Sequence, residues 1–130
     1  GQPLGAFRGF VTEKIFQSAA EIASSPTQAG AAPGDIKFRD LDKNGVINTA
    51  DQQILGSAQP KYFGGVTNTF SWKGFELSAL FQFMYGNMIY NNTRAFAEGM
   101  SNSVFGQYAT ILKRWTPQNP HNDIRYPRAV

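Results

Sequence analysis

The sequence predicts an all-β chain, a segment of a large antiparallel transmembrane β-barrel with long loops and short helical turns. Two runs, residues 62–72 and 75–85, alternate apolar side chains with small or polar ones, as the two faces of a β-strand do. Aromatic residues make up 14% of the 130 residues and charged residues only 16%, while 13 Gly and 7 Pro supply turn positions. Aromatic side chains are common where strands meet a lipid–water interface, so this composition favours a membrane-facing sheet.

The two runs pair as a hairpin if Lys73 and Gly74 form the turn between them. One face is then mainly apolar and carries Tyr62, Val66, Phe70, Trp72, Phe75, Leu77, Phe81, Phe83 and Tyr85. In this register Gly64 lies opposite Phe83, whose ring can cover the bare glycine backbone. A shift of one residue would send Glu76 and Lys73 to the apolar face, so the pattern specifies its own register. Lys73 would need a positive φ in a tight hairpin turn, which leaves the turn type open.

Each run is long enough to cross a bilayer as a tilted strand, which takes about 9–11 residues. Trp72 and Phe75 lie beside the turn, and a tyrosine lies at the far end of each strand. Two aromatic girdles around an apolar band are typical of outer-membrane barrels. A soluble β-sandwich would instead bury these rings against a second sheet, for which the remaining sequence offers little material. We therefore predict a transmembrane hairpin at 62–92 that faces the lipid bilayer, in a barrel that needs further strands to close.

The remaining sequence divides into three regions, and the absence of Met at its start suggests a piece of a longer chain. Residues 1–16 are expected to be a barrel-strand region. Residues 17–61 begin with a small-residue linker, where QSAAEIA can form a short helix, and continue into an acidic loop. Residues 93–130 form a polar, proline-punctuated loop. Within it, VFGQYATILKRW has the apolar spacing of one short helix, at Val104, Tyr108, Ile111, Leu112 and Trp115.

Residues 40–51, DLDKNGVINTAD, have nearly the ligand spacing of a twelve-residue calcium loop. Calcium binds about six to eight oxygen atoms. The candidate ligands are the side chains of Asp40, Asp42, Asn44, Asn48 and Asp51 and the backbone carbonyl of Val46. Gly45 stands at the sixth position, where the sharp turn needs unusual backbone angles. We therefore expect a structural calcium ion that braces this loop.

Two features distinguish this loop from a paired calcium sensor. The last position is Asp51, one methylene shorter than the usual Glu, and the preceding APGDIKFR contains Pro-Gly and β-forming residues. Only the exit side, ADQQILG, can be helical, with Thr49 as N-cap and Gly56 at the end. A metal-free loop held by Asx-turns remains the alternative, because Asp and Asn are common turn residues.

Few other residues indicate a site. Candidate contacts to a substrate or a partner are Tyr90, Asn92, Arg94 and Trp115, although ordinary loop packing explains each of them as well. His121 is the only histidine and the chain has no cysteine, so neither a transition-metal site nor a disulfide is expected. A net charge of +3 without a basic patch argues against nucleic acid as a partner. No nucleophile–base pair, carboxylate dyad or phosphate loop indicates an enzyme.

The stretches GDIKFRDLDKNG, WKGF, YGN and RWTPQNP follow one another along the chain. With the hairpin, they resemble the C-terminal part of SusC/RagA-type TonB-linked (TonB-dependent) outer-membrane transporters of Bacteroidetes, over essentially the whole chain. The resemblance implies a many-stranded barrel that imports oligosaccharides or peptides, with a SusD-like lipoprotein as its lid. It places the plug and the TonB-contacting segment in an N-terminal region outside this sequence. It also implies a periplasmic turn at Lys73-Gly74 and extracellular loops at 17–61 and 93–130, near the lid.

Two functions remain open from the sequence. In the first, the chain is part of an outer-membrane nutrient importer and supplies barrel strands and a calcium-braced outer loop. In the second, it is a soluble or surface-exposed, calcium-stabilised β-rich module that binds a glycan or a protein partner. The importer requires lipid and further strands, whereas the binding module would be stable as a monomer in buffer.

Overall fold

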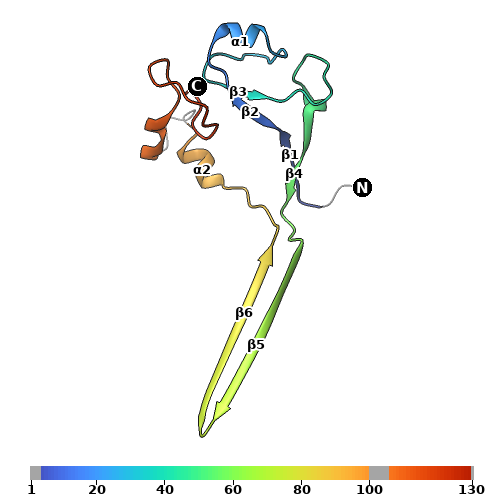
Figure 1. The fold of residues 1–130 in the computed structure, drawn as a ribbon, viewed down its shortest axis with the longest axis vertical. Coiled ribbons are helices and arrows are strands. Elements are labelled where there is room, and N and C mark those ends of the chain that lie inside the picture. The colour runs from blue at the N-terminus through green and yellow to red at the C-terminus, as the bar shows by residue number, and fades with distance from the viewer. Residues whose placement is uncertain (1–3, 100–105, 130) are drawn as a thin grey trace. The chain divides into compact units, whose positions relative to one another are not determined.

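The computed structural model describes residues 4–99 and 106–129, and strands predominate in this part of the chain (Figure 1). The strands are β1 (Ala6–Phe10), β2 (Thr12–Ile15), β3 (Ile36–Phe38), β4 (Gln52–Ser57), β5 (Tyr62–Trp72) and β6 (Phe75–Tyr85). The helices are all short: α1 (Ala19–Ala23), α2 (Asn92–Ala97) and the 3₁₀ helices η1 (Thr49–Asp51) and η2 (Ala109–Lys113). Three two-stranded sheets pair β1 with β4, β2 with β3, and β5 with β6. The all-β prediction is confirmed.

The chain divides into two compact units. The hairpin unit consists of Gly1–Arg8 and Ile54–Ile89, and the loop unit consists of Gly9–Gln53 and Tyr90–Val130. The two regions predicted as separate loops, 17–61 and 93–130, thus contribute most of their residues to a single folded unit. No helix in the described part of the chain is long and apolar enough to span a membrane.

The hairpin β5–β6 has the register that the sequence predicts. Trp72 pairs with Phe75 next to the turn, and antiparallel pairing continues without a bulge to Tyr62 and Tyr85 at the far end. At the turn, φ is 46° for Lys73 and 87° for Gly74. Two successive positive φ angles are characteristic of a type I′ turn, whose twist matches that of the flanking strands. The question of turn type left open by the sequence is thereby answered.

Side-chain pairs support this register on both faces of the hairpin. A Cβ added to Gly64 would lie 2.9 Å from the Phe83 Cζ, so the phenylalanine ring covers the glycine backbone as predicted. The rings of Tyr62 and Tyr85 stack with their centroids 4.9 Å apart. On the opposite face, hydroxyl groups of a threonine and a serine directly across from one another lie 3.4 Å apart.

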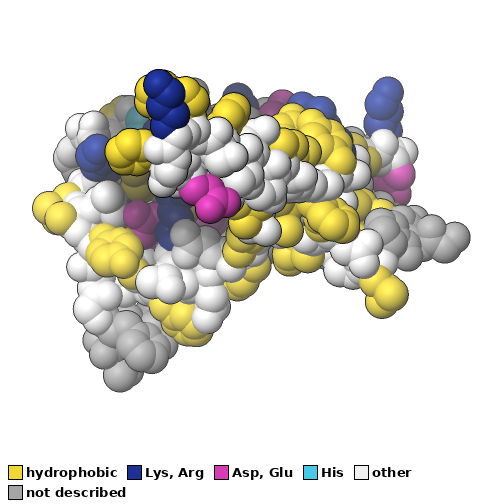
Figure 2. Space-filling view, turned by 90° about the horizontal axis from the view of Figure 1, so that it is seen from below, with side chains coloured by type: hydrophobic (Ala, Val, Ile, Leu, Met, Phe, Trp, Pro, Cys, Tyr) yellow, Lys and Arg dark blue, Asp and Glu magenta, His cyan; other side chains and the backbone are white. Residues whose placement is uncertain are grey.

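None of the described residues forms a core beneath the apolar face of the hairpin. Phe70, Leu77 and Phe81 are 63–64% exposed, and Figure 2 shows hydrophobic side chains, in yellow, open at the molecular surface. Within the described residues, β5 and β6 form hydrogen-bonded ladders only with each other. Exposed apolar rings require a non-aqueous surrounding, and the outer strand edges require neighbouring strands. The hairpin therefore has the properties of a barrel segment rather than of half a soluble sandwich.

The loop unit has a small core of its own. Phe16 is 1% exposed, Ile15 is fully buried, and Trp115 is 7% exposed. Trp115 packs on Gly34, where an added Cβ would lie only 2.4 Å from the tryptophan Cε3, at a φ of +93°. Glycine is therefore required at position 34 both for its backbone angle and for the close approach of the ring.

Hydrogen bonds connect the two distant parts of the loop unit. Gln17 accepts a 3.0 Å hydrogen bond from the Trp115 Nε1 and donates through its own amide to the backbone carbonyl of His121. The Arg128 guanidinium forms a two-point ion pair with Asp35, with Nε 2.6 Å from Oδ1. The C-terminal segment is thus fixed to the segment that follows β2.

The helix predictions are only partly correct. The expected short helix in QSAAEIA is α1, and Ser18 caps it by accepting from the Glu21 N–H. The predicted exit helix of the acidic loop is wrong: η1 ends at Asp51, its N-cap is Asn48 rather than Thr49, and β4 follows directly. Pairing with β1 explains the strand, because tertiary partners override weak local helix propensity. The helix predicted near the C-terminus is the 3₁₀ helix η2; Val104 lies outside the described residues.

Candidate functional site

The acidic loop brings its three carboxylates together. One oxygen from each of Asp40, Asp42 and Asp51 lies within 4.8 Å of the others. These residues come from the first, third and last positions of the predicted calcium loop, and the loop closes because β3 leads into it and η1 leads out. Like charges at this separation repel one another, and a bound cation would relieve that repulsion.

Asp51 fixes the two ends of the loop. It is fully buried, its Oδ2 accepts a 2.8 Å hydrogen bond from the Asn48 N–H, and its Oδ1 accepts one of 2.8 Å from the Leu41 N–H. The hydrogen bond from Asn48, with weaker help from Leu41 and Asp42, holds the pKa of Asp51 below its ordinary value despite burial. The carboxylate therefore stays ionised, as a calcium ligand must be.

Most of the other candidate ligands hydrogen-bond to the loop backbone. The Gly45 N–H donates to the Asp40 Oδ2 at 2.8 Å, and the Val46 N–H donates to the Asn44 Oδ1 at 2.8 Å. The Asn48 amide donates to the Val46 carbonyl at 3.2 Å. These are the Asx-type contacts of the metal-free alternative, so the same side chains serve both interpretations.

Two observations are nevertheless consistent with a cation in this loop. Asp40 Oδ1 is buried and accepts no hydrogen bond from any described residue, whereas its other oxygen accepts one. Gly45 has a φ of +82°, the left-handed conformation that the sharp turn of a calcium loop requires. Thr27 holds the loop from outside, since its N–H donates to the Gly45 carbonyl and its own carbonyl accepts from the Ile47 N–H. The six predicted ligands lie in one anchored loop whose chemistry suits a hard divalent cation.

The four weaker candidate contacts lie in different environments. Tyr90 is 65% exposed, and Asn92 is exposed at the start of α2. Arg94 forms an ion pair with Glu98, which also accepts a 2.7 Å hydrogen bond from the Thr110 hydroxyl. Together with two other arginines, Arg94 lines a shallow groove of about 470 Å³ in the loop unit. Trp115 is the exception: its burial against Gly34 favours the loop-packing explanation over a substrate contact.

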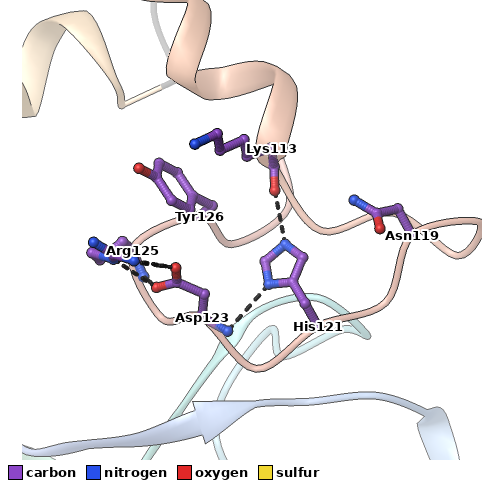
Figure 3. A pocket seen from close by; sticks show the side chains of 6 residues that line it. All are labelled: Lys113, Asn119, His121, Asp123, Arg125 and Tyr126. Carbon is purple, nitrogen blue, oxygen red and sulfur yellow. Dashed lines mark hydrogen bonds and ion pairs between the residues drawn. The ribbon is translucent and has the colours of Figure 1, made fainter.

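The loop unit contains a second pocket that the sequence does not indicate. It measures about 390 Å³ and is lined by Lys113, Asn119, His121, Asp123, Arg125 and Tyr126 (Figure 3). His121 Nε2 lies 2.9 Å from the Lys113 carbonyl oxygen, and its Nδ1 accepts from the Asp123 N–H. With Nδ1 as the acceptor, Nε2 is the ring nitrogen that donates, here to the Lys113 carbonyl. The Arg125 guanidinium lowers the pKa of Asp123 to about 2. The pocket therefore contains an imidazole held at both ring nitrogens and a closed ion pair.

Gln17, Asp35 and Arg128 are the structural residues that sequence reasoning missed in this unit. Their contacts join positions far apart in the chain. No spacing rule along a single strand or helix indicates such contacts.

Comparison with known proteins identifies relatives of the chain. It is 34% identical over 129 residues to a protein named TonB-dependent receptor P26 from Formosa agariphila, a match that covers 99% of this chain and 13% of the relative. It is 32% identical over 129 residues to TonB-dependent receptor P3 of the same organism, covering 98% of this chain and 12% of the relative. The chain thus spans only about an eighth of the length of these relatives. No family model matches it.

The names of the relatives and the geometry of the hairpin both indicate an outer-membrane β-barrel. Proteins of this name are transmembrane β-barrels of the outer membrane, and β5–β6 has the strand length, alternation and exposed apolar face of a spanning hairpin. The described strands do not close a barrel by themselves. Over nearly its whole length the chain is therefore homologous to TonB-dependent receptors, and it is a β-barrel segment of the outer membrane.

Proposed function

We propose that this chain is part of a SusC/RagA-type, TonB-dependent importer that takes up oligosaccharides or peptides. In this proposal β5 and β6 supply two strands of the barrel wall, and the protein is a transporter rather than an enzyme. TonB would act through an N-terminal region outside this sequence, and a SusD-like lipoprotein would cover the outer side. The Lys73-Gly74 turn would be periplasmic and the loop unit extracellular.

The observation that supports this proposal most is the hairpin. Its residue-by-residue register places every ring of the apolar face on one side, exposed, in strands of 11 residues each. A soluble binding module would have to cover that face, and no second sheet in the described residues does so. The names of the relatives support an importer in particular, because the outer-membrane proteins to which the chain is similar are TonB-dependent receptors.

Import is tested by deleting the whole gene in the source bacterium and measuring growth on a panel of oligosaccharides and peptides as single carbon sources. We expect growth on at least one of them to stop, and to return when the gene is restored. Loss of TonB should stop growth on the same compound. Unchanged growth on every compound, with the protein confirmed in the parent outer membrane, would contradict the importer proposal.

We further propose that the loop at 40–51 binds calcium, with Asp40, Asp42, Asn44, Val46, Asn48 and Asp51 as ligands. The close carboxylates, the left-handed Gly45 and a buried Asp40 oxygen that accepts no hydrogen bond from any described residue support this proposal. The ion would hold the loop rigid beside Thr27. Its role is structural and not catalytic.

Calcium is expected to stabilise the loop unit by about 3 kcal/mol when its free concentration exceeds Kd about a hundredfold. The measurement is hydrogen exchange of the amides of residues 40–51 with calcium and with a chelator. Asp42→Asn is the informative variant, because an amide can still accept the Asn44 N–H as an Asx-turn does but carries no charge. It should lose most of the response to calcium.

The control is Glu13→Gln, which makes the same charge change outside the loop and should respond to calcium as the parent does. Equal exchange with calcium and with chelator in the parent protein would show that Asx-turns alone hold the loop.

A further inference from the structure

We propose that Lys73, held over the ring of Trp72, binds a lipid phosphate headgroup of the leaflet that surrounds the turn of the hairpin. This inference rests on the membrane location of the chain and does not depend on the importer proposal. It assigns a ligand to the turn, which neither the sequence pattern nor the relatives assign.

Lysine is a poor choice for the turn on conformational grounds. At Lys73 φ is +46°, in the left-handed region where a Cβ is disfavoured. Asparagine followed by glycine is the preferred dipeptide for a type I′ turn, and Gly74 already provides the second residue. Because lysine is unfavourable for the backbone at position 73, we infer that its side chain has a function there.

The side chain of Lys73 reaches over the ring of Trp72, although the sequence pattern assigns Lys73 to the polar face. Its ammonium nitrogen is 5.0 Å from the centroid of the Trp72 ring. Trp72 belongs to the apolar face and is 68% exposed, and its partner Phe75 is 77% exposed. A cation–π contact of this kind orients the ammonium without neutralising its charge. The positive charge therefore lies at the level of the aromatic girdle, where bilayer headgroups begin.

No anion among the described residues pairs with this charge. Glu76 is the one acidic residue in the sequence of the hairpin unit from 54 to 89, and it pairs with Ser71 on the polar face. None of the ion pairs among the described residues involves Lys73. A cation over the ring of an interfacial tryptophan is complementary to the phosphates of the surrounding leaflet.

The test compares urea unfolding of the whole outer-membrane protein from phosphatidylcholine vesicles with and without phosphatidylglycerol. A lysine near an anionic surface contributes enough to change an equilibrium about fivefold. We expect anionic lipid to raise the folding equilibrium constant about fivefold more for the parent than for Lys73→Asn. High salt should abolish this difference, because it screens the headgroup charge. Lys73→Asn creates the preferred turn dipeptide, so it is expected to fold.

Two further variants isolate the site. Lys73→Arg keeps the charge and should respond to anionic lipid as the parent does. Lys43→Asn makes the same substitution at another left-handed lysine, φ +59°, in the acidic loop, and should also respond as the parent does. An equal response of the parent and Lys73→Asn would overturn the proposal. So would an equal gain from inorganic phosphate added to neutral vesicles, which would indicate a site for the free ion instead of the headgroup.

Discussion

Replacing Phe81 with arginine is expected to reduce the free energy of unfolding from a bilayer by about 2–4 kcal/mol. Phe81 lies near the middle of β6, opposite Val66, and 63% of it is exposed on the apolar face. An arginine there would have to enter the hydrocarbon near the midplane of the membrane. The measurement is the urea midpoint of the whole protein refolded in phosphatidylcholine vesicles.

The next residue along the strand provides the matched control. Gln82 lies on the opposite face, across from Gly65, so Gln82→Arg places the same charge in the pore. We expect a change within about 0.5 kcal/mol, as for other solvated surface positions. If both variants were destabilised to the same extent, the assignment of one face to lipid and the other to water would be wrong.

Replacing Trp115 with alanine is expected to destabilise the loop unit by about 3–5 kcal/mol. The indole is almost fully buried against Gly34, and its Nε1 donates to Gln17, which would lose this partner. Both parts of the loop unit meet at this ring, so both should loosen together. Hydrogen exchange of residues 16–35 and 113–129 measures this directly.

Leu112→Ala is the control for this prediction. Leu112 lies only three residues away and is 76% exposed, so its truncation should change exchange very little. If Trp115→Ala left exchange of the loop unit unchanged but impaired uptake of a substrate, Trp115 would be a contact residue and its packing role would be wrong.

The hairpin could be predicted from the sequence because its information is local. Alternation with period two specifies the faces, and the position of Glu76 excludes a register shifted by one residue. The observed pairing therefore agrees with the prediction from Trp72–Phe75 to Tyr62–Tyr85. Only the turn type needed the structure, because lysine does not by itself indicate a positive φ.

The loop unit could not be predicted in this way because its information is long-range. Asp35 and Arg128 are 93 residues apart, and Gln17 and Trp115 are 98 apart. Each is an ordinary loop residue when viewed within its own segment. The residues after the acidic loop are a further example. Local signals allow a helix there, but β4 forms because it pairs with β1.

The acidic loop is an intermediate case. Its spacing is that of a calcium loop, and one oxygen from each of Asp40, Asp42 and Asp51 lies within 4.8 Å of the others, with Gly45 in the left-handed conformation. Asp and Asn suit both calcium ligation and Asx-turns, because each task needs a short side chain with an accepting oxygen. The sequence pattern therefore defines the loop but does not distinguish between its two possible stabilising interactions.

The most direct test of the membrane hairpin is a cysteine scan along β6 in the whole protein in lipid vesicles. None of these 130 residues is a cysteine, so each position from 75 to 85 can carry the single reactive thiol once any cysteine elsewhere in the whole protein has been replaced. The rate of reaction with a charged, membrane-impermeant maleimide reports contact with water. We predict fast labelling at Glu76, Ser78 and Gln82 and protection at Leu77, Ala79 and Phe81, in strict alternation. Labelling rates without that alternation would contradict the central claim that β6 separates lipid from a water-filled pore.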